Sequence, residues 1–193
     1  MNRMNQLFHL APLAAVLFCA AASAQAPTQP AAVTSVPPPP ATKIEAFKPA
    51  AGTVVTFGYN ELGSVSGISV DAREIRDTKG NVARGVAVEV TQSEYRQETA
   101  FVDTDELPEL LKGIDALLGV KTNPTTFENF EVRYTTKGDL QVTAFNRGAQ
   151  IKYAVQAGRI TKAQAFVDED ALRKLRTVFE TASQQLGTQP GKD

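Results

Sequence analysis

The fold is decided by the stretch Ala100-Phe101-Val102-Asp103-Thr104-Asp105-Glu106-Leu107-Pro108-Glu109-Leu110. It recurs 65 positions later as Ala165-Phe166-Val167-Asp168-Glu169-Asp170-Ala171-Leu172-Arg173-Lys174-Leu175, with seven of the eleven residues identical. Each copy passes from an apolar segment through acidic residues into leucines at helical spacing. This is the pattern of a strand that runs into a capped amphipathic helix. The sequence therefore predicts two copies of one structural unit.

The first unit is predicted to have four strands before its helix. They are Thr53–Asn60, with Val55, Phe57 and Tyr59 on one face, Ile68–Asp77, a strand in which Val86, Val88 and Val90 alternate with other residues, and Tyr95–Val102. We expect residues 61–67 to be a flexible connector. Ile75 is out of phase with Ile68 and Val70, which predicts a β-bulge near Arg73 and Glu74.

The first helix is predicted to start from a cap at Thr104 or Asp105, because Pro108 is tolerated only in the first turn of a helix. Gly119 is placed to end it. Its apolar stripe consists of Leu107, Leu110, Leu111, Ile114, Leu117 and Leu118. These residues predict a helix that buries one face against a sheet.

The second unit repeats this order. Its predicted strands are Phe127–Thr136, Asp139–Asn146, Ala149–Ala157 and Arg159–Val167, and its helix carries the stripe Leu172, Leu175, Phe179, Ala182 and Leu186 before Gly187. Ile151, Tyr153 and Val155 follow Val86, Val88 and Val90 by 65 positions, so the repeat extends back into the preceding strand. We expect Phe101 and Phe166 to occupy equivalent buried sites where strand meets helix.

The predicted fold class is therefore α+β, with two ββββα repeats in which antiparallel sheets each have one amphipathic helix packed on them. Residues 51–187 are expected to form a single domain, with repeats at about 51–119 and 127–187. Whether the two sheets share one core is left open by the sequence.

The N-terminal region predicts export. Residues 1–24 combine Arg3, an apolar run and the A-x-A site Ala22-Ser23-Ala24, which together are typical of a cleaved signal peptide. Residues 25–50 are rich in Pro and Ala and are expected to be a disordered tether. Residues 188–193 are expected to be a disordered tail. The predicted location is periplasmic or secreted.

Cleavage of this signal would restrict the available chemistry. His9, Cys19, Met1 and Met4 all lie within it, and the chain contains no Trp. The mature protein would then lack a disulfide, a thiol nucleophile, a Ser-His triad and any histidine-ligated metal. The formal net charge of −1 gives no indication of a polyanion-binding surface. We therefore expect neither an enzyme nor a cofactor.

Two acidic clusters, Asp103 to Glu106 and Asp168 to Asp170, are interpreted as helix caps, because carboxylates at helix N-termini accept orphan backbone amides. They lack the glycine and the spacing of a calcium-binding EF-hand loop. No metal site is predicted.

The fourth strand of each unit is the candidate partner-binding edge. An apolar phase is interrupted by polar residues at matching places in both copies, and the candidate residues are Tyr95, Gln97, Thr99, Lys162 and Gln164. An exposed strand edge can accept another strand. The main expectation is an exported, non-enzymatic binding or scaffold module of unknown partner, with an envelope protein or a second copy at such an edge. Ordinary solvated edge strands are the other interpretation.

Two alternative functions stay open. The element order resembles the two-repeat architecture of the Whirly-type single-stranded nucleic-acid binders, and this resemblance implies a nucleic-acid surface. Acidic residues are mixed among the basic and aromatic ones, and Tyr134 and Tyr153 are in phase with core positions. A carboxylate-based hydrolase would need two suitably spaced carboxylates, and the candidates are Glu74, Asp77, Glu89, Glu94 and Glu98.

Overall fold

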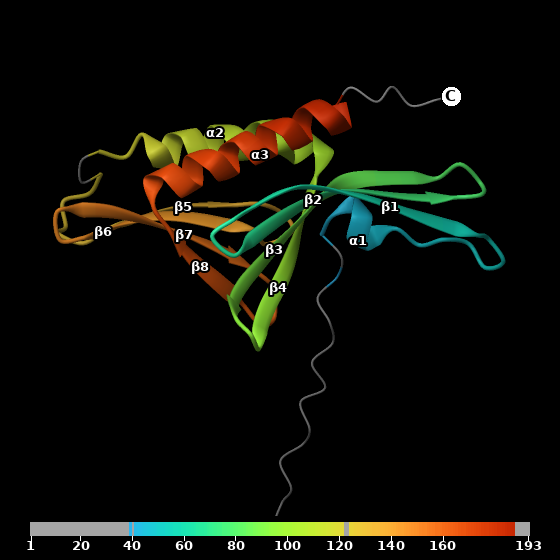
Figure 1. Cartoon of the computed structure of the whole chain (residues 1–193), viewed down its shortest axis with the longest axis horizontal. Helices are drawn as coiled ribbons and strands as arrows, with labels where there is room; N and C mark the ends of the chain where they lie inside the picture. Colours follow the sequence, from blue (N-terminus) through green and yellow to red (C-terminus); the bar gives the residue numbers. More distant parts are fainter. Residues whose placement is uncertain (1–38, 40, 122–123, 188–193) are drawn as a thin grey trace, which may run out of the picture. The chain divides into compact units, whose positions relative to one another are not determined.

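The structure is a computed structural model that describes residues 39, 41–121 and 124–187. It contains two four-stranded antiparallel sheets, each followed in the chain by a helix (Figure 1). The predicted α+β class with two ββββα units is confirmed. The predicted signal peptide, the tail and the tether up to residue 38 lie outside the described residues.

The first unit comprises sheet A and the helices around it. Sheet A has the order β1-β2-β3-β4. In chain order the elements are α1 (Lys43–Ala46), β1 (Val55–Val65), β2 (Ile68–Asp77), β3 (Val82–Ser93), β4 (Arg96–Asp103), the 3-10 turn η1 (Thr104–Glu106) and α2 (Leu107–Leu118).

The second unit comprises sheet B and the last helix. Sheet B has the order β5-β6-β7-β8. The elements are β5 (Glu131–Thr135), β6 (Gln141–Arg147), β7 (Gln150–Ala157), β8 (Ala163–Val167) and α3 (Glu169–Gly187). Consecutive strands pair in both sheets, so β1 and β4 are the edges of sheet A, and β5 and β8 are the edges of sheet B.

Two predictions about the first strands are wrong. Residues 61–65 belong to β1 and are not a flexible connector, because they pair with the start of β2. The bulge lies in β1, where the register shifts between Glu61 and Gly63, and β2 pairs with β3 without a shift near Arg73. The bulge turns the apolar residues of β1 that precede it, Phe57 and Tyr59, away from the helices.

Strands β5 and β8 are shorter than predicted. Residues 127–130 and 159–162 lie outside them. Gly158 adopts a φ of 104°, which turns the chain out of the β7 ladder, and residues 158–162 then form the loop that leads into β8. Lys162, predicted to lie within the strand, therefore belongs to this loop.

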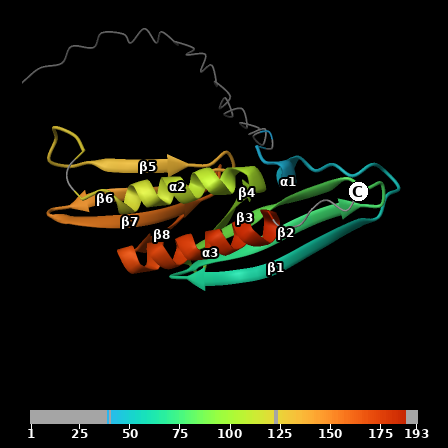
Figure 2. The same ribbon diagram turned by 90° about the horizontal axis from the view of Figure 1, so that it is seen from above.

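Each helix packs on the sheet of the other unit. Helix α2 lies on β5 and β6, α3 lies on β1 and β2, and the two helices contact each other (Figure 2). Leu107, Leu110 and Ile114 of α2 are fully buried, as are Leu172 and Phe179 of α3. They belong to one hydrophobic cluster that includes the inner faces of both sheets. The two sheets thus share a single core.

The inner faces of the sheets also approach each other directly, with β3 close to β8. The core residues of β8 are Ala163, Ala165 and Val167, and Ala100 and Val102 are their counterparts in β4. These small side chains allow the two sheets to come close, because little volume has to be accommodated between them. Large aromatic residues of the same strands point to the opposite face.

The internal repeat holds structurally, with one difference in register. Val102 pairs with Val86 in sheet A, and Val167 pairs with Tyr153 in sheet B. Tyr153 is therefore the counterpart of Val86, whereas the sequence offset of 65 predicts Ile151. The shift is an even number of residues, so the buried phase predicted for β7 is preserved.

The ordered chain begins earlier than the predicted domain boundary. Lys43–Ala46, which the sequence analysis assigned to the tether, form α1. Thr42 and Glu45 form a capping box, and Ile44 is only 8% exposed. Helix α1 lies against β3 and β4 on the side of sheet A that faces away from α2 and α3 (Figure 1).

Candidate functional site

Each sheet has an outer face, which points away from α2 and α3. The strand registers place Phe57, Tyr59, Arg73, Ile75, Ala87, Thr99 and Phe101 on the outer face of sheet A, here called outer face A. They place Arg133, Gln141, Thr143, Phe145, Arg147, Lys152, Ala154, Gln156, Gln164 and Phe166 on outer face B. Both outer faces carry aromatic residues.

Outer face B is built from rows of directly paired residues. One row crosses β6, β7 and β8 with three glutamines, Gln141, Gln156 and Gln164. The next row contains Ala154 and Phe166, and in the row beyond it Phe145 is opposite Lys152. The side chains in the second and third rows put aromatic and cationic groups next to each other.

Phe145 and Phe166 form an aromatic pair on this face. Their ring centroids are 6.1 Å apart and the ring planes are inclined by 68°, an edge-to-face arrangement. Phe166 is 69% exposed, which is unusual for so large an apolar side chain in an ordered strand. Exposed apolar surface with polar residues around it is typical of an interaction site.

A pocket of about 520 Å³ lies beside this aromatic pair. It is lined by Phe145, Arg147, Lys152, Tyr153, Phe166, Val167 and Asp168. We call it the Phe166 pocket. Neither Arg147 nor Lys152 has an ion-pair partner among the described residues. Within the described residues, two cations beside the aromatic pair thus have no anionic partner.

Outer face A differs in charge and in cover. Phe57 and Tyr59 are exposed, and the Arg73 guanidinium lies 5.3 Å from the centroid of the Tyr59 ring, a cation–π contact. The same guanidinium donates to Asp71 at 2.7 Å. Its cation is therefore already paired. The apolar hollow of this face, lined by residues that include Ile75 and Phe101, also contains Ile44 of α1.

The expectation that Phe101 and Phe166 are both buried at the strand–helix junction is wrong. They do occupy equivalent positions, opposite Ala87 and Ala154, but both point to the outer faces. Phe101 is half-buried and Phe166 is exposed. The alternate positions, Val102 and Val167, face the core.

Helix α1 is held on outer face A by polar contacts as well as by Ile44. The backbone amide of Lys43 donates to Asp103 Oδ1 at 2.9 Å, and Lys43 Nζ lies 3.0 Å from Asp105 Oδ2. The hydrogen bond to Asp105 raises the pKa of Lys43 and lowers the pKa of Asp105. Burial raises the pKa of Asp103. Upstream, Arg159 Nη1 donates to the Pro39 carbonyl oxygen at 2.6 Å.

The five predicted partner-binding residues are distributed over both sheets. Tyr95 lies in the β3–β4 turn and is 96% exposed, and Gln97 and Thr99 are exposed on β4. Gln164 is half-buried on outer face B, and Lys162 is exposed in the loop before β8. Gln164 is the one that lies on the same face as the aromatic pair.

Parts of both predicted edges contact the other unit. A Cβ on Gly138 would overlap the Phe101 carbonyl oxygen, so the β5–β6 turn lies directly on the β4 edge. Thr161 donates to Glu98 of β4, and the Gln164 amide donates to Gln92 Oε1 at 3.1 Å. Strand addition at the rest of these edges stays a prediction.

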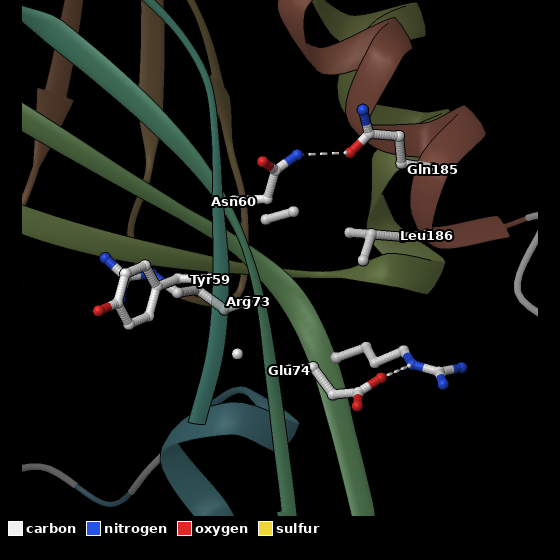
Figure 3. Close-up of a pocket in the computed structure, with 9 residues that line it drawn as sticks. Tyr59, Asn60, Arg73, Glu74, Gln185 and Leu186 are labelled. Atoms are coloured by element: carbon white, nitrogen blue, oxygen red, sulfur yellow. Dashed lines mark hydrogen bonds and ion pairs between the residues drawn. The ribbon is translucent and has the colours of Figure 1, made fainter. Parts of the chain in front are cut away.

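A pocket of about 540 Å³ lies near the end of α3, between Asn60, Glu74, Arg84, Gln185 and Leu186 (Figure 3). Its polar groups bond to one another: Asn60 Nδ2 donates to Gln185 Oε1 at 3.1 Å, and Arg84 Nε donates to Glu74 Oε2 at 2.6 Å. The hydrogen bond from Arg84 lowers the pKa of Glu74. A carboxylate held ionised by an arginine is poorly suited to act as a general acid.

The other carboxylates considered for hydrolysis include groups with structural roles. Asp77 accepts from the amides of Lys79 and Asn81 and from Asn81 Nδ2, which lowers its pKa and stabilises the β2–β3 turn. Asp168 belongs instead to the second acidic cluster. Its Oδ1 accepts from the Ala171 amide at 2.8 Å, so its predicted capping role is confirmed. Within residues 39, 41–121 and 124–187, no group of three or more Asp, Glu, His or Cys side chains is placed to hold a metal ion.

Comparisons with protein-family models, with curated proteins and with solved structures find no match to this chain. The resemblance to Whirly-type proteins therefore rests on element order alone, and function has to be argued from the site. None of the described helices has the length and apolar character needed to cross a bilayer.

The predicted partner-binding residues did not include Phe145, Arg147 or Lys152. A signal was present in the strand pattern. Phe145 shares its phase with Gln141 and Thr143, and Phe166 shares its phase with Gln164, whereas the core residues occupy the other phase. An aromatic residue in the polar phase of a strand indicates a ring on the outer face of the sheet.

Proposed function

We propose that the protein is an exported, non-enzymatic binding module whose partner binds on outer face B. The observation that carries this proposal is the Phe145–Phe166 pair on a sheet face, with the ring of Phe166 exposed. The cations of Arg147 and Lys152 lie beside the pair and have no ion-pair partner among the described residues. Burial of aromatic rings beside a few oriented polar groups is how small interfaces obtain most of their affinity. Export is supported by the signal pattern in residues 1–24.

The face, rather than the strand edge, is the better candidate surface for two reasons. The described edges of β4 and β8 have part of their length in contact with the other unit through Gly138, Thr161 and Gln92. The face has the exposed ring of Phe166, which lies outside the hydrophobic core. A solvent-exposed Phe has no folding role that another residue could not fulfil.

Site-specific photo-crosslinking in the native host tests the proposal. A benzophenone amino acid at position 166 is expected to form a defined adduct, and the same amino acid at Lys174, which is exposed on α3, is not. The first position lies on the proposed surface and the second on the opposite side of the molecule. If neither position forms an adduct, or both form the same ones, outer face B is not a binding surface.

A single-stranded nucleic acid is the second candidate ligand, since rings and cations share one sheet face. Titration with a labelled oligothymidylate at two salt concentrations tests it. Binding that weakens with salt and with Lys152→Glu would favour this candidate.

A further inference from the structure

The Phe166 pocket is the counterpart of the place that α1 occupies on sheet A. On sheet A, α1 is bound at Asp103, with Ile44 close to Gly85 and beside Phe101. The counterparts of Asp103 and Phe101 are Asp168 and Phe166, and both line the Phe166 pocket. A short segment of the chain itself thus covers one of two equivalent places, and no segment of the described residues covers the other.

The side chains around the open place differ in a way that indicates its ligand. In sheet A, Gly85 allows Ile44 to approach the backbone. The equivalent residue in sheet B is Lys152, and Arg147 lies nearby. Both cations lack an ion-pair partner among the described residues. A segment bound here would place an apolar side chain on Phe145 and Phe166 and a carboxylate beside Lys152 and Arg147.

The dimensions and the ring geometry favour a peptide. About 520 Å³ is within the range of about 300–1,000 Å³ that ligand pockets usually have. Nucleobases stack on exposed ring faces, whereas Phe145 and Phe166 are inclined by 68° and so do not form one flat platform.

We propose that the Phe166 pocket binds a short peptide segment of a partner protein, in which an apolar side chain is adjacent to an aspartate or glutamate. The segment occupies on sheet B the place that α1 occupies on sheet A. This inference rests on the proposed function and specifies its partner class. Phe145 and Phe166 supply the apolar contact, and Arg147 and Lys152 supply charge complementarity.

Selection of a random dodecapeptide library on the full chain without its predicted signal tests the inference. We expect enriched peptides that contain an apolar residue next to Asp or Glu. In fluorescence anisotropy titrations, the affinity of these labelled peptides should fall at least about tenfold with Phe166→Ser and with Lys152→Glu. Lys174→Glu on α3 is the matched control and should leave the affinity unchanged. Circular dichroism and urea unfolding establish that each variant keeps the fold.

Several results would overturn the inference. One is that selection on the wild type enriches no peptides beyond those that selection on the Phe166→Ser protein enriches. Another is that the enriched peptides are basic or wholly apolar. A further outcome is that an oligothymidylate or polygalacturonate binds the wild type more tightly than the Phe166→Ser variant, while no peptide shows such a difference. The peptide inference then fails while the proposed function stands. If the wild type sediments as a dimer and Phe166→Ser as a monomer, the ligand is a second copy and the inference again fails. Absence of any adduct at position 166 would contradict the proposed function itself.

Discussion

Phe101 and Phe166 occupy matching positions in two sheets of the same topology, yet Phe101 is half-buried and Phe166 is 69% exposed. Neither strand accounts for the difference, because both rings point to the outer face. The neighbours of the two rings do account for it. Helix α1 lies on outer face A with Ile44 beside Phe101, and no described segment covers the equivalent place on outer face B.

The two outer faces differ in the pairing of their charged side chains as well as in whether α1 covers them. On outer face A the Arg73 cation is bonded to Asp71, and the α1 backbone is bonded to Asp103. On outer face B, Arg147 and Lys152 are unpaired within the described part of the chain. The two copies of the unit thus share one fold, but α1 packs on the outer face of the first copy and no described segment packs on that of the second. Fold and surface chemistry are separable in this molecule.

The largest expected effect comes from separating the two faces. A fragment of residues 39–119 contains all of sheet A, but the helix that covers this sheet is α3 of the other unit. We expect this fragment to give no cooperative unfolding transition as a monomer, whereas residues 39–187 unfold cooperatively. Circular dichroism with size-exclusion chromatography measures both. A monomeric, cooperatively folded fragment would show that the units are independent and that the crossed packing is dispensable.

Removing the cover of outer face A should have the next largest effect. Ile44→Ala deletes a side chain that is 8% exposed, and we expect a loss of about 2–3 kcal/mol in the free energy of unfolding, from lost transfer energy and a residual cavity. Ile160→Ala is the matched control, since Ile160 is exposed in the loop before β8, and should cost less than about 0.5 kcal/mol. Urea titration compares them. Equal losses would mean that α1 does not stabilise the sheet.

Truncating the two matching phenylalanines sharpens the comparison further. Phe101→Ala should lower the free energy of unfolding by about 1–2 kcal/mol, because the ring is only partly removed from water, and Phe166→Ala by less than about 0.5 kcal/mol. Thermal and urea unfolding of each variant give the two values. A large loss at Phe166 would place its ring in the core and remove the basis for a binding surface on outer face B.

The smallest expected effect is a change in pH dependence at the α1 anchor. Because burial raises the pKa of Asp103, the folded protein binds its proton more tightly than the unfolded chain does. This group therefore favours folding below its unfolded pKa of about 3.9, and that contribution is lost as the pH rises through the folded pKa. Asp103→Asn cannot titrate. The difference in unfolding free energy, variant minus wild type, should increase as the pH rises through this window.

Urea unfolding at pH 3.5, 5 and 7 measures that difference. Other carboxylates, including Asp77 and Glu74, have lowered pKa values and act in the opposite direction, but they are present in both proteins and cancel. A difference that is constant with pH would mean that Asp103 is not buried by α1.

Much of the fold could be predicted because its signals are local. The leucine stripe and Gly119 define α2, and the alternation of Val86, Val88 and Val90 defines β3. Which sheet each helix covers could not be predicted, because an amphipathic stripe indicates that a helix has a buried face without specifying against what. The position of the β1 bulge depends on pairing with β2, which is equally non-local.

The candidate site was predictable only in part. Gln164 was predicted as part of a partner-binding strand edge and lies on outer face B, whereas Phe166 was assigned to the core because large apolar residues usually lie there. The preference for alanine at Ala163 and Ala165 arises from the approach of β3 to β8, a contact between residues far apart in the sequence. The docking of α1 depends on Asp103 and Gly85 in the same way.

The crossed packing of the helices sets the order in which this chain can fold. Sheet A is complete once Asp103 has been synthesised, but its inner face stays uncovered until α3, which ends at Gly187, is available. A chain that emerges N-terminus first would therefore expose an apolar sheet while residues 104–187 are synthesised, with its stabilising contacts far away in sequence. Long-range contacts of this kind slow folding and favour aggregation of intermediates. We therefore expect the native packing of this domain to form only after α3 has been synthesised.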